Sequence, residues 1–482
     1  MINYKEMPKG TLNINLIQVF STVGYAILMG LLNFYLTNHG GFSKTEANTL
    51  TASFFALNFL LHFLGGALGG KYFSFRGLFL FSLVLQIISM FFIATTDKHL
   101  ILMGMALFIT GSGLNVSCVN MMLTQLFAAN DKKRNIAFSV NYSCMNIGFV
   151  MSFIFAGIMQ GNDNYHIAFY AASVCLVIAF VIHLLNLKNV NDKNTYFDQS
   201  FSKSNARFVV APAIITVCFF FSLFLMYNPH IGTNLVIVTF VAVLSYLLYI
   251  AYNQSPEYRL KIFAFIILSS ACMIFAFVQG MQSSALETFV EFNTNKSLFG
   301  ISLQPATVNA FESLGVIVFG FVLAICSRRR HLNNKTLLPG SLITRGVGLY
   351  IIAFMMIPLG IHFAGSDGIV NVIFPILLLI IVAAGEIHVN ATNYALVGEL
   401  IEPKHQGLFT GYMFVSIAIG IVMSGPISNY AIGNIDGNDI SALDTNHLYS
   451  NIFSIMTVIA IFITIVFFLI SKRLNKVFIV EK

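Results

Sequence analysis

Residues 208–226 read FVVAPAIITVCFFFSLFLM and contain no charged side chain. A helix needs about 20 mostly apolar residues to cross the hydrocarbon core of a bilayer, so this run is long enough to span a membrane. A second uncharged run, residues 232–252, follows after a short connection. The two runs predict a pair of membrane helices near the middle of the chain, and the remaining sequence extends the pattern on both sides.

The composition of the whole chain also indicates a membrane protein. Of its 482 residues, 57% are hydrophobic and 9% are charged, whereas a soluble domain carries about 25% charged residues. The net charge of +7 lies in short loops, where it sets membrane topology, so we expect no nucleic-acid partner. The six cysteines stand singly in apolar stretches, and no nucleotide-binding loop or metal-ligand spacing occurs. We therefore expect no cofactor and no metal.

Fourteen stretches are long and apolar enough to span a membrane. They cover residues 14–36, 47–70, 77–96, 100–127, 136–160, 166–187, 208–226, 232–252, 261–286, 306–326, 342–363, 369–397, 406–431 and 449–471. With a cytoplasmic N-terminus, the termini and the cytoplasmic loops hold all 26 Lys and Arg residues except Lys44, Lys98 and Lys296. Cytoplasmic loops carry an excess of Lys and Arg, so this distribution predicts an even number of spans and both termini in the cytoplasm.

Fourteen spans are twelve plus two, and the extra pair lies where a protein of two six-helix halves has its central link. We therefore predict a six-helix bundle over residues 1–187, a cytoplasmic linker and inserted helical hairpin over 188–260, and a second six-helix bundle over 261–482. This plan resembles the major facilitator fold, an all-α membrane architecture whose halves alternate access to a site near the membrane midplane.

Short strings narrow the resemblance to one family. Residues 138–148, FSVNYSCMNIG, resemble the helix 5 signature F-S-x-x-Y-x-x-x-N-x-G of the proton-dependent oligopeptide transporter family. Weaker matches are LLNFYLT at 31–37, FESL at 311–314 and GEI at 385–387. The turn GGALGGK at 65–71 resembles the major facilitator loop between helices 2 and 3, with glycine at position 70 where that pattern has Asp. The chain is therefore identified as a divergent member of this POT or PTR family.

The resemblance breaks at the ionic residues that the family uses for proton coupling. Gln18, Ser21 and Thr22 stand where the first helix of the family carries E-x-x-E-R. The family's helix 4 lysine falls on Val116, and its helix 7 acid falls on Val278. A buried charge that has lost its partner is very costly, whereas losing both leaves a neutral wall. We expect the N-terminal bundle not to bind protons in the family's manner.

Two acidic residues inside the C-terminal spans are the strongest site candidates, because desolvating a charge in a membrane is costly. Glu386 matches the family acid that is expected to meet the amino group of the substrate, and Glu312 lies at a family Gln position. Both are candidates to carry a coupled proton. The alternatives are that Glu386 only lines a water-filled surface and that Glu312 is an interfacial acid.

Polar side chains of both bundles complete the predicted substrate site. The full set is Tyr25, Asn58, His62, Asn146, Gln279, Glu386 and Asn390. Tyr25 and Asn146 match family site residues, and Asn58 and His62 lie one turn apart on one helix face. Asn390 shares a face with Glu386 through the i+4 spacing. Hydrogen-bonded packing is the alternative for His62, and contact between helices is the alternative for the two asparagines of the N-terminal bundle.

The sequence as a whole predicts a secondary transporter of small polar solutes. The resemblance implies di- or tripeptides or amino-acid-like compounds as substrates, with proton coupling altered or absent. The alternatives are transport of another metabolite, such as a siderophore or drug-like compound, and a membrane sensor without flux. No known catalytic spacing links the intramembrane residues, so we do not expect an enzyme. We expect a monomer in the inner membrane of a bacterium, in contact with lipid, with a small molecule as its partner and protons as a second partner if coupling is retained.

Overall fold

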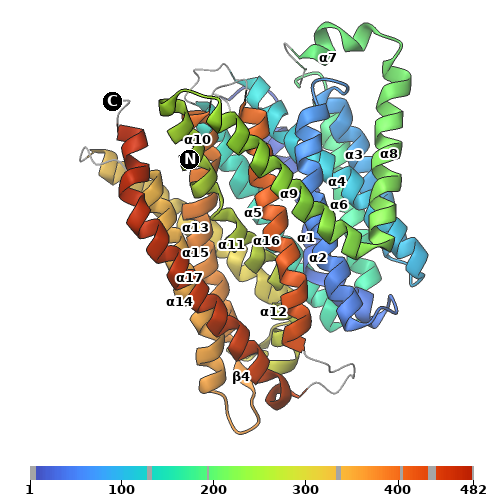
Figure 1. Ribbon diagram of the computed structural model, residues 1–482. Coiled ribbons are helices and arrows are strands. Elements are labelled where there is room, and N and C mark those ends of the chain that lie inside the picture. Colours follow the sequence, from blue (N-terminus) through green and yellow to red (C-terminus); the bar gives the residue numbers. More distant parts are fainter. Residues whose placement is uncertain are drawn as a thin grey trace. The chain divides into compact units, whose positions relative to one another are not determined.

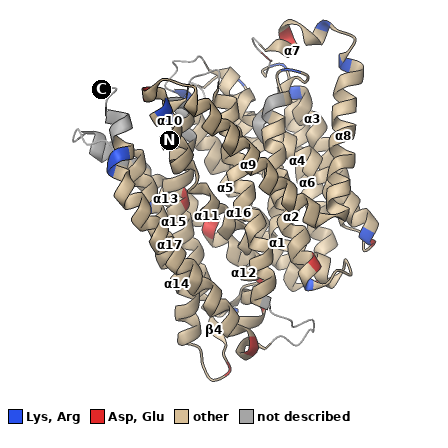
Figure 2. Cartoon of the chain, in the orientation of Figure 1, with Lys and Arg blue, Asp and Glu red and all other residues tan. Residues whose placement is uncertain are grey.

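The computed structural model of the protein describes residues 7–127, 133–190, 192, 195–332, 338–401, 405–432 and 441–479 (Figure 1). Among these residues, fourteen helical segments are long and apolar enough to cross a membrane. The predicted all-helical architecture with fourteen spans is therefore confirmed. Figure 2 shows that the described Lys and Arg residues lie near helix ends, while long uncharged stretches make up the helices. This is the distribution that a bilayer imposes on membrane-spanning helices.

The chain divides into two compact units. Unit 1 comprises Met1–Ser43 and Ser53–Asn234, and unit 2 comprises Lys44–Ala52 and Leu235–Lys482. The helices from the N-terminus to the central hairpin are α1 (Thr11–Asn38), α2 (Lys44–Leu68), α3 (Phe75–Ile93), α4 (Lys98–Leu126), α5 (Lys133–Gly161), α6 (Tyr165–Asn186), α7 (Tyr196–Gln199), α8 (Arg207–Tyr227) and α9 (Pro229–Tyr252). Helix α8 groups with unit 1, whereas most of α9 groups with unit 2.

The helices of the second half form most of unit 2. They are α10 (Pro256–Ser269), α11 (Cys272–Gln282), α12 (Ala285–Asn293), α13 (Pro305–Leu332), α14 (Pro339–His362), α15 (Ile373–Leu400), α16 (Gln406–Ile432) and α17 (Ala442–Ile479). Four two-residue strands connect them: β1 (Thr294–Asn295) pairs in parallel with β4 (Val370–Asn371), and β2 (Ser297–Leu298) pairs antiparallel with β3 (Ile301–Ser302). The first turns of α2 also belong to unit 2, where Asn48 Nδ2 donates to Asn429 Oδ1 at 3.0 Å.

The span predicted over 261–286 is not one continuous helix. It consists of α10 and α11, and α12 continues it after a break at Ser283 and Ser284. Both serine hydroxyls donate to the carbonyl oxygen of Gly280, at 3.2 and 2.9 Å, and Ser284 leaves helical geometry at φ −150° and ψ −97°. Serine side chains that bond to the backbone compete with helical hydrogen bonds, which gives a local reason for the break.

The linker after α6 packs against the turn between α2 and α3 in unit 1. The backbone N–H of Phe197 donates to Gly70 O at 2.8 Å, and the rings of Tyr72 and Phe201 meet edge to face at 5.4 Å. Gly70 has φ +73°, a conformation that favours glycine over other residues. This part of the linker therefore has defined contacts with unit 1.

Candidate functional site

The predicted site residues of unit 1 lie on three helices and are mostly buried. Tyr25 of α1 places its ring against Phe55 at 5.3 Å and Phe149 at 6.1 Å, and its hydroxyl is buried without a hydrogen-bond partner among the described residues. On α5, Asn146 donates to the carbonyl oxygen of Tyr142 at 3.0 Å, within its own helix. This part of unit 1 presents a phenol and an amide and no charged group.

Asn58 and His62 both contact α4 from one face of α2. Asn58 Nδ2 donates to Ser112 Oγ at 3.3 Å, while Asn58 Oδ1 is buried without a partner among the described residues. His62 Nδ1 lies 3.0 Å from the carbonyl oxygen of Gly113. These contacts favour a packing role over a substrate-binding role for both side chains, because each bonds to the neighbouring helix.

Gln18 and Thr22 of α1, which the sequence predicts to stand at the positions of the ionic helix 1 cluster, form a local hydrogen-bonded pair. Gln18 Nε2 donates to Thr22 Oγ1 at 3.2 Å, and the Thr22 hydroxyl donates to the Gln18 carbonyl oxygen at 2.7 Å. Among the described residues, the amide and the hydroxyl bond to each other and to no ionised side chain. The chemistry available at these positions is therefore hydrogen bonding.

In unit 2, Glu386 stands at one end of a connected polar network. Asn390 Nδ2 lies 3.4 Å from Glu386 Oε1, one turn along α15. The thiol of Cys272, at the start of α11, lies 3.5 Å from Asn390 Oδ1, and Asn393 Nδ2 donates to the same sulfur at 3.0 Å. Glu386 itself is 8% exposed. The network joins α11 to α15 and holds a carboxylate in a largely buried position.

Glu312 of α13 lies in a second polar contact of unit 2. Gln282, the last residue of α11, donates from Nε2 to Glu312 Oε2 at 2.5 Å. The Tyr350 hydroxyl of α14 is buried without a hydrogen-bond partner among the described residues. Gln279 is one turn from Gln282, and its Oε1 is buried without a partner among the described residues. Glu312 and Gln282 thus form a buried acid–amide contact of unit 2, with the amide of Gln279 one turn away on α11.

Sequence reasoning missed a third buried acid, Glu287. It lies in the first turn of α12, is 1% exposed, and accepts a hydrogen bond from Asn309 Nδ2 of α13 at 3.1 Å. The predicted span ended at residue 286, one position short of this acid. Treating the polar residues just beyond a span as part of it would have found Glu287.

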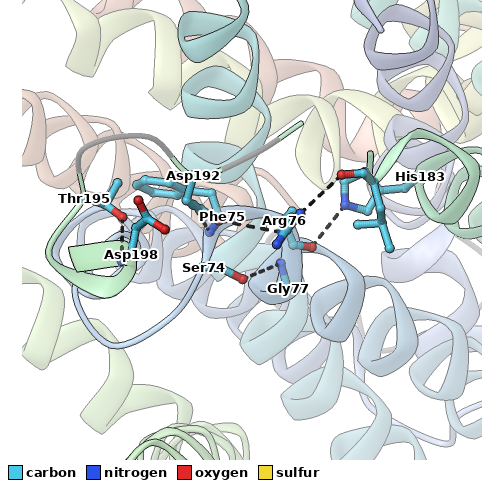
Figure 3. Close-up of polar contacts among 9 residues, drawn as sticks. Ser74, Phe75, Arg76, Gly77, His183, Asp192, Thr195 and Asp198 are labelled. Atoms are coloured by element: carbon cyan, nitrogen blue, oxygen red, sulfur yellow. Dashed lines mark hydrogen bonds and ion pairs between the residues drawn. The ribbon is translucent and has the colours of Figure 1, made fainter. Parts of the chain in front are cut away.

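A second missed feature is the carboxylate of Asp192 in the linker (Figure 3). Asp192 Oδ1 accepts from the Phe75 N–H at 2.8 Å, and Oδ2 lies 4.0 Å from Arg76 Nε. Burial raises the pKa of Asp192, while the Phe75 N–H and the Arg76 guanidinium oppose that rise. Behind Arg76, its carbonyl oxygen lies 3.1 Å from His183 Nε2. Asp192 therefore places an acid near Arg76, beside a turn that has glycine at position 70.

The described residues contain no group of three or more His, Cys, Asp or Glu side chains placed to hold a metal ion. Their polar groups can instead bind and orient a solute through amides, phenols and carboxylates. Carboxylates can also accept protons or meet an ammonium group.

Comparison with known proteins identifies the family. The POT family matches residues 73–432 of the chain. Dipeptide and tripeptide permease A of Chromobacterium violaceum is 24% identical over 483 residues, covering 100% of this chain and 96% of the permease.

Solved structures show the same fold. A POT family transporter in complex with 5-aminolevulinic acid superimposes with a TM-score of 0.83, at 21% identity and 97% coverage of both chains. A tetrameric PepTSo2 structure gives 0.82 at 18% identity, covering 97% of this chain and 98% of that chain. The protein is therefore a multi-pass membrane transporter and not an enzyme, and it belongs to the POT family of the major facilitator superfamily.

Proposed function

We propose that the protein is a secondary active transporter of di- or tripeptides or amino-acid-like compounds, working by alternating access. The curated relative named above is a dipeptide and tripeptide permease, and the match spans this whole chain. The basic residues predict that both termini are cytoplasmic, and the bacterial relatives support placement in the inner membrane of a bacterium. The substrate assignment has separate support from the chemistry of unit 2.

The observation that carries the proposal is the largely buried Glu386 with Asn390 one turn away. Free peptides and amino acids carry an ammonium group, which an ionised carboxylate in a low-dielectric site binds strongly. Asn390, held by Cys272, keeps an amide next to that carboxylate. In this proposal Glu386 recognises the substrate amine, and Gln279 supplies a neutral contact from the same unit. Tyr25 and Asn146 are the neutral contacts proposed for unit 1, whereas the bonds of Asn58 and His62 to α4 favour packing roles for these two side chains.

We further propose that proton coupling differs from that of relatives with the acidic helix 1 cluster. Unit 1 offers Gln18 and Thr22, which satisfy each other as neutral groups. Buried acids of unit 2 are then the groups proposed to accept a coupled proton, and Glu312 and Glu386 are the two that the sequence predicts for this role. A pH gradient should therefore drive accumulation through buried carboxylates of unit 2 and not through the first helix.

Uptake of a labelled dipeptide into proteoliposomes tests the proposed function. Glu386→Gln should abolish uptake, while Glu291→Gln should retain it. Glu291 is a matched control, because it is an acid of the same unit that is partly exposed and paired with Lys296 at 2.8 Å. Unchanged uptake in Glu386→Gln would remove Glu386 from the site.

The same assay separates the other candidate functions. Uptake of a siderophore or drug-like compound, with no uptake of peptides or amino acids, would favour another metabolite. Binding without flux of any solute would favour a sensor. The monomeric state remains a prediction, since one related structure is described as tetrameric; the mass of the purified protein in detergent tests it.

A further inference from the structure

The break between α11 and α12 brings together a second group of acids and amides in unit 2. Gln282 ends α11 just before the break, and Glu287 lies in the first turn of α12 just after it. Both side chains contact α13: Gln282 bonds to Glu312, and Glu287 bonds to Asn309. Asn309 and Glu312 are three residues apart on that helix and so lie on one face. The result is two adjacent acid–amide pairs at a discontinuous membrane helix.

Each pair leaves buried acceptors without a donor. Glu312 Oε1, Glu287 Oε2 and Gln282 Oε1 have no hydrogen-bond partner among the described residues. The side chains are almost sealed from solvent, with exposures of 6% for Glu312, 1% for Glu287 and 0% for Gln282. Buried acceptors are normally satisfied, so three in one place indicate that something carrying a positive charge or a donor hydrogen belongs there.

The described residues around these carboxylates provide no cation in contact with them. Among the described residues, neither Glu287 nor Glu312 forms an ion pair. The titratable groups on the neighbouring elements include Tyr350 of α14, Tyr449 of α17, whose ring meets Phe289 of α12 at 4.9 Å, and Glu386 of α15. Two basic residues lie beside α12: Lys296, which is paired with Glu291, and Lys44, whose Nζ lies 5.4 Å from the centroid of the Phe292 ring.

Two ionised carboxylates in such a place would each cost several kcal/mol in lost solvation. A proton removes that cost with the smallest possible ligand, since it converts the carboxylate into a neutral acid with a donor hydrogen. A glutamate that accepts a proton from water and later returns it changes charge by one and needs no other reactant.

We propose that the break between α11 and α12 is a two-proton site, in which Glu287 and Glu312 each bind one proton during the transport cycle. The inference rests on the proposed transport function and deepens it: Glu287 becomes a coupling residue, and two protons can move with each substrate. Discontinuous membrane helices are where transporters place coupling-ion sites. The unpartnered oxygens on both sides of this break fit that use.

Proton stoichiometry tests the proposal during transport. At a gradient of one pH unit, each coupled proton raises the limiting accumulation ratio of substrate about tenfold. Glu287→Gln and Glu312→Gln should each lower that ratio about tenfold relative to the wild type, whereas Glu291→Gln should leave it unchanged. An unchanged ratio in Glu287→Gln, or accumulation driven by a sodium gradient instead of a pH gradient, would overturn the proposal.

A spectroscopic arm separates this proposal from the proposed function, because it needs no substrate. Infrared difference spectra of the purified protein between acid and alkaline pH report the C=O stretch of protonated carboxyl groups. Glu287→Gln should remove part of that band and Glu287→Asp should shift it, with both variants checked for an unchanged melting temperature. An identical band in the wild type and Glu287→Gln would refute protonation of Glu287, even if no transported solute were found.

Discussion

Replacing Glu386 with Gln is the sharpest perturbation of the proposed recognition site. The substitution keeps the size of the side chain and its ability to contact Asn390, but it removes the negative charge from a position that is 8% exposed. Removing one partner of a buried, hydrogen-bonded charge pair costs about 2–5 kcal/mol. Every 1.4 kcal/mol is about a tenfold change in Kd, so dipeptide affinity should fall by at least roughly 30-fold.

The assay is calorimetric titration of the purified protein with a dipeptide and with its N-acetylated form. The wild type should bind the free dipeptide far more tightly, because only that form carries an ammonium group. Glu386→Gln should bind both forms with similar, weak affinity, and Glu291→Gln should behave as the wild type. If Glu386→Gln still prefers the free amine by the wild-type ratio, Glu386 does not recognise the ammonium group.

Three further predictions concern a hydrogen bond in the site, the packing of two helices and the pH dependence of stability. Asn390→Ala removes a hydrogen bond to a charged group, worth about 1.5–3 kcal/mol, so calorimetry should show weaker dipeptide binding than in the wild type; unchanged affinity would exclude that support for Glu386. Gly111→Ala would put a Cβ 2.7 Å from a backbone oxygen of α3, so overpacking should cost about 1–3 kcal/mol and lower the melting temperature. Gly407→Ala, which meets no atom within 4 Å, should not lower it, and equal melting temperatures of the two alanine variants would contradict the packing argument. Burial raises the pKa of Asp192 above its unfolded value, so the stability it contributes is fully present below the unfolded pKa and is lost as pH rises through the folded pKa. Melting curves across that range should therefore show a weaker pH dependence in Asp192→Asn, and identical pH profiles would count against this assignment.

The number of spans could be predicted from the sequence because every segment that crosses the lipid must be apolar over about 20 residues. Each span needs a long apolar run, and the polar connections between runs are plainly visible, as at 188–207. Tertiary contacts are harder to read in a chain that is apolar almost throughout. The linker packs on the α2–α3 turn through contacts of Asp192 with Phe75 and Arg76. The spacing of apolar and polar residues in the sequence does not predict such a contact.

The candidate site could be predicted only in part, for a similar reason. The i+4 spacing placed Asn390 on the face of Glu386, and the structure has their side chains 3.4 Å apart. The break before α12 was not predicted, because residues 261–286 form an apolar run in which two serines look unremarkable. Without the break, Glu287 fell outside the predicted span, and its pairing with Asn309 could not be foreseen.

We propose that the carboxylates of unit 2, and not the polar residues of the first helix, couple protons to substrate. Peptide-driven acidification of the liposome interior, followed with an enclosed pH dye, tests it most directly. Replacing Gln18 and Thr22 together with Ala should leave that acidification in place, and replacing Glu287 and Glu312 together with Gln should remove it. If acidification were lost in the variant with Ala at positions 18 and 22, or persisted in the variant with Gln at positions 287 and 312, coupling through the acids of unit 2 would be wrong.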